Sequence, residues 1–191
     1  MKQKTKIISM AEIAIFASIG FILDLLASLY SGFFVNGGSI SFAMIAVVVI
    51  SYRRGSLAGF CCGLIMGLLD LTDGFYTYAD KWYQSILQIG MDYIFTYMSI
   101  GLVALAKPLI KKINYVIVIT ISTIFGGLLK FILHFLSGVL YWPEFPEQPI
   151  LERCIYSIIY NGSYMLPYII ISGIIVTLMA IKFKNLFMIE E

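Results

Sequence analysis

The sequence contains few of the residues on which soluble enzymes and metal proteins depend. Only 13% of its residues are charged, there is a single histidine, and the three cysteines are odd in number. Cys61 and Cys62 are adjacent, so they offer neither a disulfide framework nor the usual spacing of metal ligands. The chain also lacks a G-x-x-x-x-G-K-[ST] loop, an H-E-x-x-H pair and a G-x-S-x-G turn. These absences indicate a protein that is not an enzyme, needs no metal or cofactor and cannot use ATP by itself.

Apolar residues are abundant by contrast. They make up 60% of the 191 residues, and the mean hydropathy of +0.93 is too high for one soluble core to hide them. Several runs approach the ~20 apolar residues that a bilayer-spanning helix needs. We therefore expect an all-α membrane protein with six transmembrane helices in a single domain, residues 1–191. The predicted helices cover 7–30, 39–52, 55–72, 85–106, 114–142 and 152–181.

Basic residues are distributed unequally between the segments that join these predicted helices. If the N-terminus lies inside the cell, ten Lys and Arg residues fall inside and only Lys81 and Arg153 fall outside. Because positive residues favour the cytoplasmic side of a membrane, the sequence predicts that both termini are cytoplasmic. The ten inside residues are Lys2, Lys4, Lys6, Arg53, Arg54, Lys107, Lys111, Lys112, Lys182 and Lys184.

Asp92 is the clearest polar residue at membrane depth, where a charge is costly and usually marks a functional site. Gln88, Asp92 and Thr96 are spaced four residues apart and therefore share one helix face, with Tyr93 beside them. An anionic carboxylate next to an aromatic ring suits an organic cation, because the exclusion of water strengthens both ion pairing and cation–π attraction. The alternative is that Asp92 pairs with Lys130 and holds two helices together.

Three further charged residues lie in apolar segments. Lys130 is near the middle of the predicted helix 114–142, so it must face the bundle interior, a carboxylate or a ligand anion. Of these, a structural pairing is the interpretation we favour. Asp24 and Asp70 lie near the outer ends of their helices, and we interpret both as side chains that reach the lipid headgroups.

The lone histidine lies in a second candidate wall, within "HFLSGVLYW" at 134–142. His134, Gly138 and either Tyr141 or Trp142 follow one stripe of a helix, in which the glycine leaves space and an aromatic side chain closes the outer end. This pattern predicts a pocket wall that is open to the outside. In the next helix, Asn161 needs hydrogen-bond partners within the membrane, either on a neighbouring helix or on a ligand.

Five stretches of the sequence carry a recognisable pattern. They are "EIAIFASIGFILD" (12–24), "SYRRGSLAGFCCGLIMGLLD" (51–70), "QIGMDYIFTYMSIGLVAL" (88–105), "KFILHFLSGVLYW" (130–142) and "YSIIYNGS" (156–163). Together they resemble the thiamine-specific substrate-binding (S) components of energy-coupling-factor (ECF) transporters, and the resemblance covers nearly the whole chain. It implies a six-helix subunit, in the cell membrane of a prokaryote, that captures thiamine from outside.

The resemblance also implies how each ring of thiamine would be held. Asp92 would face the positively charged thiazolium, Tyr93 would lie beside it, and Trp142 would stack on a ring of the ligand. Tyr156 and Asn161 would hydrogen-bond the aminopyrimidine side.

Four further substrate-binding residues are predicted: Gln88, from the helix face that it shares with Asp92, and His134, Trp82 and Tyr83, from the resemblance. His134 would orient polar groups deeper in the pocket. Trp82 and Tyr83, which precede Gln88 by six and five residues, match an aromatic pair in the outer loop of the family.

Partners follow from the same resemblance. Ala14 and Ser18, one helical turn apart, would contact the coupling transmembrane subunit, and two cytoplasmic ATPase subunits would supply the energy. The alternatives are an S component for another vitamin, for a thiamine phosphate or for a related pyrimidine, and a stand-alone small-molecule carrier.

Overall fold

The structure, a computed structural model, describes residues 2–29, 38–79, 81–141 and 147–188, and every regular element in these ranges is helical. The predicted all-α class is therefore confirmed. In chain order the elements are α1 (Lys2–Ser28), α2 (Ala43–Arg54), α3 (Ser56–Asp73), α4 (Trp82–Ile89), η3 (Gly90–Phe95), α5 (Thr96–Ile100), η4 (Gly101–Lys111), α6 (Tyr115–Tyr141), α7 (Ile150–Lys182) and α8 (Lys184–Phe187). The π-helical turn η3 and the 3₁₀ helix η4 continue α4 and α5, so that Trp82–Lys111 is one helical segment.

Five of the predicted spans appear as helices that are long and apolar enough to cross a membrane. They are Gln3–Ser28, Ser56–Asp73, Trp82–Lys111, Tyr115–Tyr141 and Ile150–Lys182. Their outward faces carry large exposed apolar side chains, such as Ile121 and Phe125 on α6, which is the arrangement expected where lipid replaces water. The chain is thus built as a multi-pass membrane protein.

The second predicted span, 39–52, differs from the other five. Residues 38–42 are not helical, and α2 has only 12 residues, or about 18 Å, against a hydrocarbon core of about 30 Å. Residues 43–52 of α2 are all buried. A helix that is apolar all round can be enclosed by protein rather than by lipid, which explains why the apolar run at 43–50 has the composition of a span.

Tight turns and close helix packing place these elements. Gly55 joins α2 to α3 with a φ of 96°, a conformation that residues with a side chain rarely adopt. Along α3, Gly59, Gly63 and Gly67 are each one turn apart, and an added Cβ would meet the backbone of Gly101, Tyr97 and Tyr93, respectively. The absence of a side chain at these three positions therefore lets the segment that carries Asp92 lie directly against α3.

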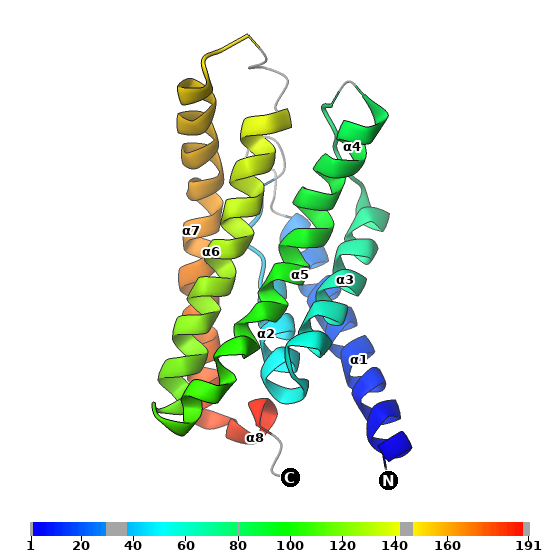
Figure 1. The fold of residues 1–191 in the computed structure, drawn as a ribbon, viewed down its shortest axis with the longest axis vertical. Helices are drawn as coiled ribbons and strands as arrows, with labels where there is room; N and C mark the ends of the chain where they lie inside the picture. The colour runs from blue at the N-terminus through cyan, green and yellow to red at the C-terminus, as the bar shows by residue number, and fades with distance from the viewer. Residues whose placement is uncertain (1, 30–37, 80, 142–146, 189–191) are drawn as a thin grey trace.

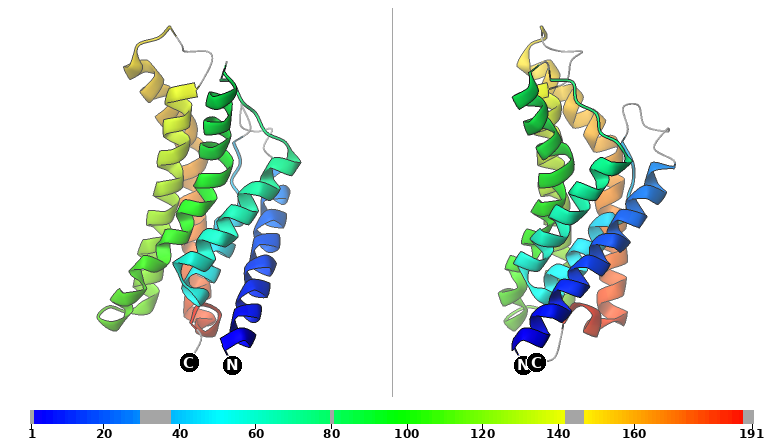
Figure 2. Two further views of the ribbon diagram at one scale, coloured as in Figure 1. Left: turned by 45° about the vertical axis from the view of Figure 1, so that its right-hand side comes forward. Right: turned by 90° about the vertical axis from the view of Figure 1, so that its right-hand side faces the viewer.

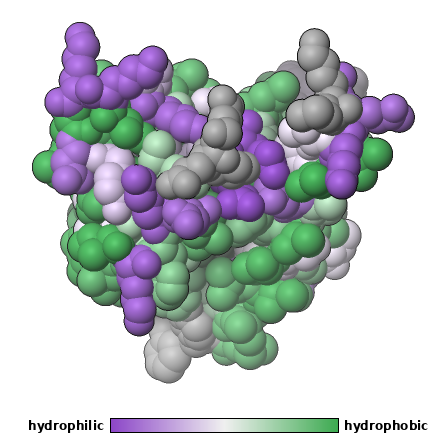
Figure 3. Space-filling view, turned by 90° about the horizontal axis from the view of Figure 1, so that it is seen from below, coloured by the Kyte–Doolittle hydropathy of each residue, from purple (hydrophilic) through white to green (hydrophobic). Residues whose placement is uncertain are grey.

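The helices run roughly along the long axis of the molecule, and α1 begins at the same end at which α8 ends (Figures 1 and 2). At this end Glu12 binds Arg53 and Arg54, with oxygen–nitrogen distances of 3.0 and 2.6 Å, and so ties α1 to the α2–α3 turn. Figure 3 shows hydrophilic side chains gathered across this end, with hydrophobic side chains along part of its edge. A polar end beyond an apolar body is expected where a membrane protein emerges from the bilayer into water.

Candidate functional site

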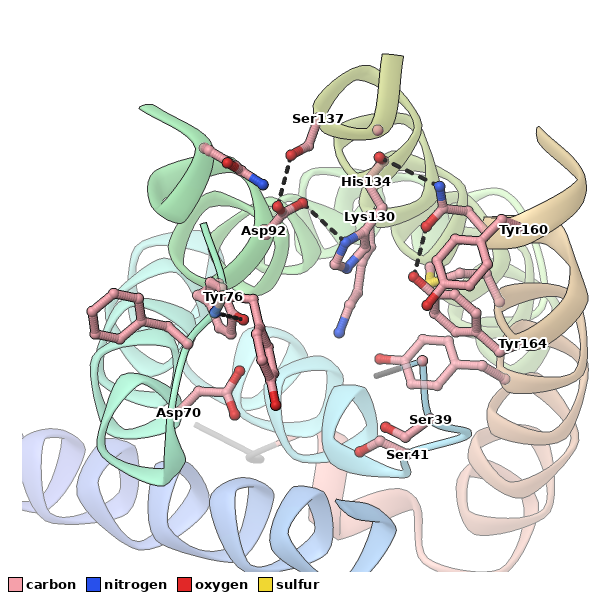
Figure 4. A pocket seen from close by; sticks show the side chains of 18 of the residues that line it. Ser39, Ser41, Asp70, Tyr76, Asp92, Lys130, His134, Ser137, Tyr160 and Tyr164 are labelled. Atoms are coloured by element: carbon pink, nitrogen blue, oxygen red, sulfur yellow. Dashed lines mark hydrogen bonds and ion pairs between the residues drawn. The ribbon is translucent and has the colours of Figure 1, made fainter. Parts of the chain in front are cut away.

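A cavity of about 590 Å³ lies between the helices at the other end of the bundle. Its lining side chains come from α1, α3, the Trp82–Lys111 segment, α6 and α7, and from the non-helical segments 38–42 and 74–79. The volume lies within the range of about 300–1,000 Å³ that is usual for small-molecule sites. Figure 4 shows the cavity and the polar side chains that converge on it.

Asp92 forms one wall, within the π-helical turn η3. Ser137 Oγ on α6 donates a hydrogen bond to Asp92 Oδ2 at 2.7 Å, and His134 Nδ1 lies 3.4 Å from Asp92 Oδ1. These two contacts fix the carboxylate against α6 while it lines the cavity (Figure 4). A π-helical turn re-aims a side chain from its normal helical direction, and such turns are frequent at functional sites.

A hydrogen-bond network joins α6 to α7 behind His134. The amide nitrogen of Asn161 donates to the Ser157 carbonyl at 3.0 Å, to Ser157 Oγ at 3.1 Å and to the His134 carbonyl at 3.5 Å. Tyr164 donates its hydroxyl hydrogen to Asn161 Oδ1 at 2.7 Å. The cross-helix bonding that we considered for Asn161 is therefore present, and it fixes the position of Tyr164 in the cavity.

Gln88 and Tyr93 hold a segment over the cavity. Gln88 Oε1 accepts hydrogen bonds from the Tyr78 backbone N–H at 2.9 Å and from Thr77 Oγ1 at 3.2 Å. The Tyr76 backbone N–H donates to the Tyr93 hydroxyl at 2.9 Å. Both anchors therefore order segment 74–79, which brings Tyr76 and Tyr78 into the lining.

A polar cluster forms the deep part of the cavity. The Lys130 side chain is 7% exposed, and its ammonium lies 3.9 Å from the Tyr97 ring centroid and 5.1 Å from that of Tyr168. The Tyr97 hydroxyl donates to Asp24 Oδ2 at 2.6 Å, and Asp70 lines the same cavity. The structure thus places Lys130 against two aromatic rings, and it places Asp92 against Ser137 and His134 rather than Lys130. It also places Asp24 and Asp70 in the cavity lining, which corrects our interpretation that they reach the headgroups.

The structure brings together six of the nine predicted substrate-binding residues. The six that line the cavity are Gln88, Asp92, Tyr93, His134, Tyr156 and Asn161. Trp82 and Tyr83 are 76% and 44% exposed at the start of α4, do not line the cavity and pack edge-to-face on each other. Trp142 lies outside the described residues. Ala14 and Ser18 are exposed on α1, and Ser18 Oγ donates to the Ala14 carbonyl at 2.9 Å.

Three tyrosines of α7 were not among the predicted substrate-binding residues. Tyr160, Tyr164 and Tyr168 line the cavity together with Tyr156. The signal that could have found them is their spacing, because the four tyrosines recur every fourth residue and so follow one face of the helix.

Comparison with known proteins decides the family. Residues 10–188 match the family model described as thiamine transporter protein (Thia_YuaJ). The chain belongs to the thiamine transporter family. It is also 31% identical over 188 residues to the thiamine transporter ThiT of Bacillus subtilis (strain 168), a match that covers 94% of this chain and 93% of that protein.

A solved structure of ThiT from Listeria monocytogenes is similar to this member of the thiamine transporter family. Its TM-score is 0.72 at 27% sequence identity, and the match covers 96% of this chain and 99% of that one. The family resemblance seen in the sequence is therefore confirmed. Members of this family are transport proteins, which agrees with the prediction that the chain is not an enzyme.

The chemistry of the cavity suits binding rather than reaction. A fixed carboxylate, several tyrosines and a buried lysine offer ion pairing, stacking and hydrogen bonds. Among the residues that the structure describes, no three His, Cys, Asp or Glu side chains are grouped as metal ligands. This set of groups can hold an aromatic organic cation.

Proposed function

We propose that this chain is the high-affinity thiamine-binding S component of an ECF-type vitamin importer. The observation that carries the proposal is the Asp92 carboxylate, which His134 and Ser137 hold at the wall of a tyrosine-lined cavity in a member of the thiamine transporter family. Thiamine is an aromatic cation with a permanent charge on its thiazolium ring. Its positive charge and its two aromatic rings would match the carboxylate and the tyrosines that line this cavity.

Charge pairing would supply much of the affinity. In a site from which water is excluded, the attraction between Asp92 and the thiazolium is stronger than at an exposed surface. Two unit charges 4 Å apart attract by about 4 kcal/mol at an effective dielectric constant of about 20, and a desolvated cation–π contact contributes up to about 2 kcal/mol. Tyr93 and Tyr156 line the cavity and would contact the rings of the ligand, and Trp142 would stack on one of them.

His134 and Asn161 would act largely by orienting other groups. His134 positions Asp92, and Asn161 positions Tyr164, through the contacts described above. The second lone pair of Asn161 Oδ1 would accept from the exocyclic amine of the pyrimidine. Gln88 would contribute by ordering segment 74–79 over the bound ligand.

Import would require partner proteins. The chain contains no P-loop, so a coupling transmembrane subunit and two cytoplasmic ATPase subunits would supply the energy. The exposed Ala14 and Ser18 on α1 would form the contact with the coupling subunit, because small residues let helices approach closely. The chain would cross the membrane six times, with α2 and residues 38–42 as one crossing and both termini in the cytoplasm.

A ligand panel tests the proposed function. Thiamine, thiamine monophosphate, riboflavin and biotin are titrated separately into the purified full chain, and the fluorescence of its two tryptophans is followed. We expect saturable quenching by thiamine at the lowest concentration. A response to riboflavin or biotin, with none to thiamine, would contradict the proposal and favour an S component for another vitamin.

Reconstitution separates the subunit from a stand-alone carrier. Proteoliposomes that contain only this chain should bind thiamine but should not accumulate it when an ion gradient is applied. Accumulation driven by the gradient would support the carrier and refute the S-component assignment.

A further inference from the structure

The four tyrosines of α7 form a continuous wall of the cavity. The rings of Tyr156 and Tyr160 are stacked, with centroids 5.9 Å apart and planes 6° apart. Tyr160 and Tyr164 pack at 5.7 Å with an angle of 66° between their planes, so the two rings form a corner. We call Tyr160 and Tyr164 the tyrosine corner. The His134 ring packs against Tyr164 at 6.4 Å.

The tyrosine corner faces Asp92 across the cavity. Tyr160 and Tyr164 project from α7, whereas Asp92 projects from the opposite side, on the Trp82–Lys111 segment (Figure 4). All three side chains line the same cavity (Figure 4). A ligand cation that approaches Asp92 therefore enters the space between a carboxylate and two aromatic rings.

The two tyrosine rings and the Asp92 carboxylate all favour a positively charged ligand. The face of an aromatic ring is electronegative, and its attraction for a cation increases when water is excluded. Tyr164 is 7% exposed, and its hydroxyl donates its hydrogen to Asn161. Neither ring offers comparable attraction to an uncharged ligand of the same shape.

We propose that the tyrosine corner is a charge-selecting element, which discriminates thiamine from uncharged molecules of the same shape by enclosing the thiazolium opposite Asp92. This inference rests on the proposed function, and it assigns to Tyr160 and Tyr164 a specificity role in the same site. Asp92 supplies the net negative charge, and the two rings replace the water that would otherwise solvate the far side of the cation.

Tyr160 is the position at which to test the corner, because Tyr164 also holds the α6–α7 network through Asn161. Two ligands are compared: thiamine, and 3-deazathiamine, in which an uncharged thiophene replaces the thiazolium. Their dissociation constants are measured by calorimetric titration of the purified full chain. The variants are Tyr160→Leu, which removes the ring, and Tyr160→Phe, which keeps it. Phe125→Leu serves as a control that removes an exposed ring of α6 outside the cavity.

Tyr160→Leu should weaken thiamine binding between about three- and thirtyfold and change 3-deazathiamine binding by less than about twofold. Phe125→Leu should bind both ligands as the unmodified protein does, and Tyr160→Phe, which keeps the ring, should keep the preference for thiamine over 3-deazathiamine that Tyr160→Leu loses. Retained binding of 3-deazathiamine shows that the leucine variant is folded.

Two results would overturn the inference. If Tyr160→Leu loses affinity equally for both ligands, the ring only fills space; if it loses affinity for neither, the ring has no role in binding. If the unmodified protein binds no thiamine, the proposed function itself fails, and that outcome is distinct from failure of the tyrosine corner.

Discussion

Replacement of Gly138 by alanine should disturb the contact between α6 and α7 on which one wall of the cavity depends. A Cβ at Gly138 would overlap Ser157 Oγ and would lie 3.2 Å from Ser157 Cβ and 3.4 Å from Asn161 Nδ2. Ser157 Oγ donates to the Phe135 carbonyl at 2.9 Å and bonds Asn161 Nδ2 at 3.1 Å. The added methyl group must therefore displace the serine hydroxyl, and both bonds are lost or lengthened.

The expected loss of stability follows from these contacts. Overpacking a filled interface costs about 1–3 kcal/mol, and each lost hydrogen bond costs about 1 kcal/mol. Because α7 can shift to relieve part of the strain, we expect a net loss of about 2–4 kcal/mol. At about 2–4 °C per kcal/mol for a chain of this size, the melting temperature should fall by roughly 5–15 °C. Thiamine affinity should fall with it, since Asn161 fixes Tyr164 in the cavity.

The assay is thermal unfolding of the purified protein in one detergent, with and without thiamine. Gly162→Ala on α7 is the matched control, because an added Cβ there meets no atom within 4 Å. It makes the same chemical change in a helix that faces α6, and it should leave melting and binding nearly unchanged. If Gly138→Ala and Gly162→Ala have the same melting temperature, the close contact of α6 and α7 does not stabilise the fold as we argue.

Two further substitutions test contacts at opposite ends of the molecule. Glu12→Gln removes the charge that binds Arg53 and Arg54 and should lower the free energy of unfolding by about 1–3 kcal/mol, while thiamine affinity stays unchanged; an unaltered melting curve would show that the cluster contributes nothing. Gln88→Ala frees segment 74–79 and should speed thiamine dissociation in stopped-flow fluorescence by about tenfold, as expected from the loss of two hydrogen bonds. Dissociation at the unmodified rate would refute the anchoring role.

Much of the fold and of the candidate site could be predicted from local patterns. The lengths of the apolar runs identified five of the helices. The helical spacing of polar residues predicted that His134 and Asp92 lie in the walls of a pocket. The same criterion of apolar length predicted the span 39–52 but not that its helical part is the short, buried α2, because composition does not tell whether neighbouring helices or lipid surround an apolar helix. Burial of that kind depends on tertiary packing.

Other features depend on backbone paths that no local pattern specifies. Segment 74–79 turns back over the cavity, so Tyr76 and Tyr78 line it, whereas Trp82 and Tyr83, which the resemblance favoured, do not. Lys130 on α6 lines the same cavity as Asp24 on α1 and Asp70 on α3, which no local pattern places together. In these cases the residues were visible in the sequence, but their partners were not.

The central claim is that Asp92 holds the thiazolium of thiamine in this cavity, and equilibrium titration of the purified chain with thiamine and 3-deazathiamine tests it most directly. The unmodified protein should bind thiamine tightly, and Asp92→Asn should weaken thiamine binding by about 10- to 100-fold, with a far smaller effect on the uncharged analogue. Tight binding of thiamine by Asp92→Asn would contradict the account.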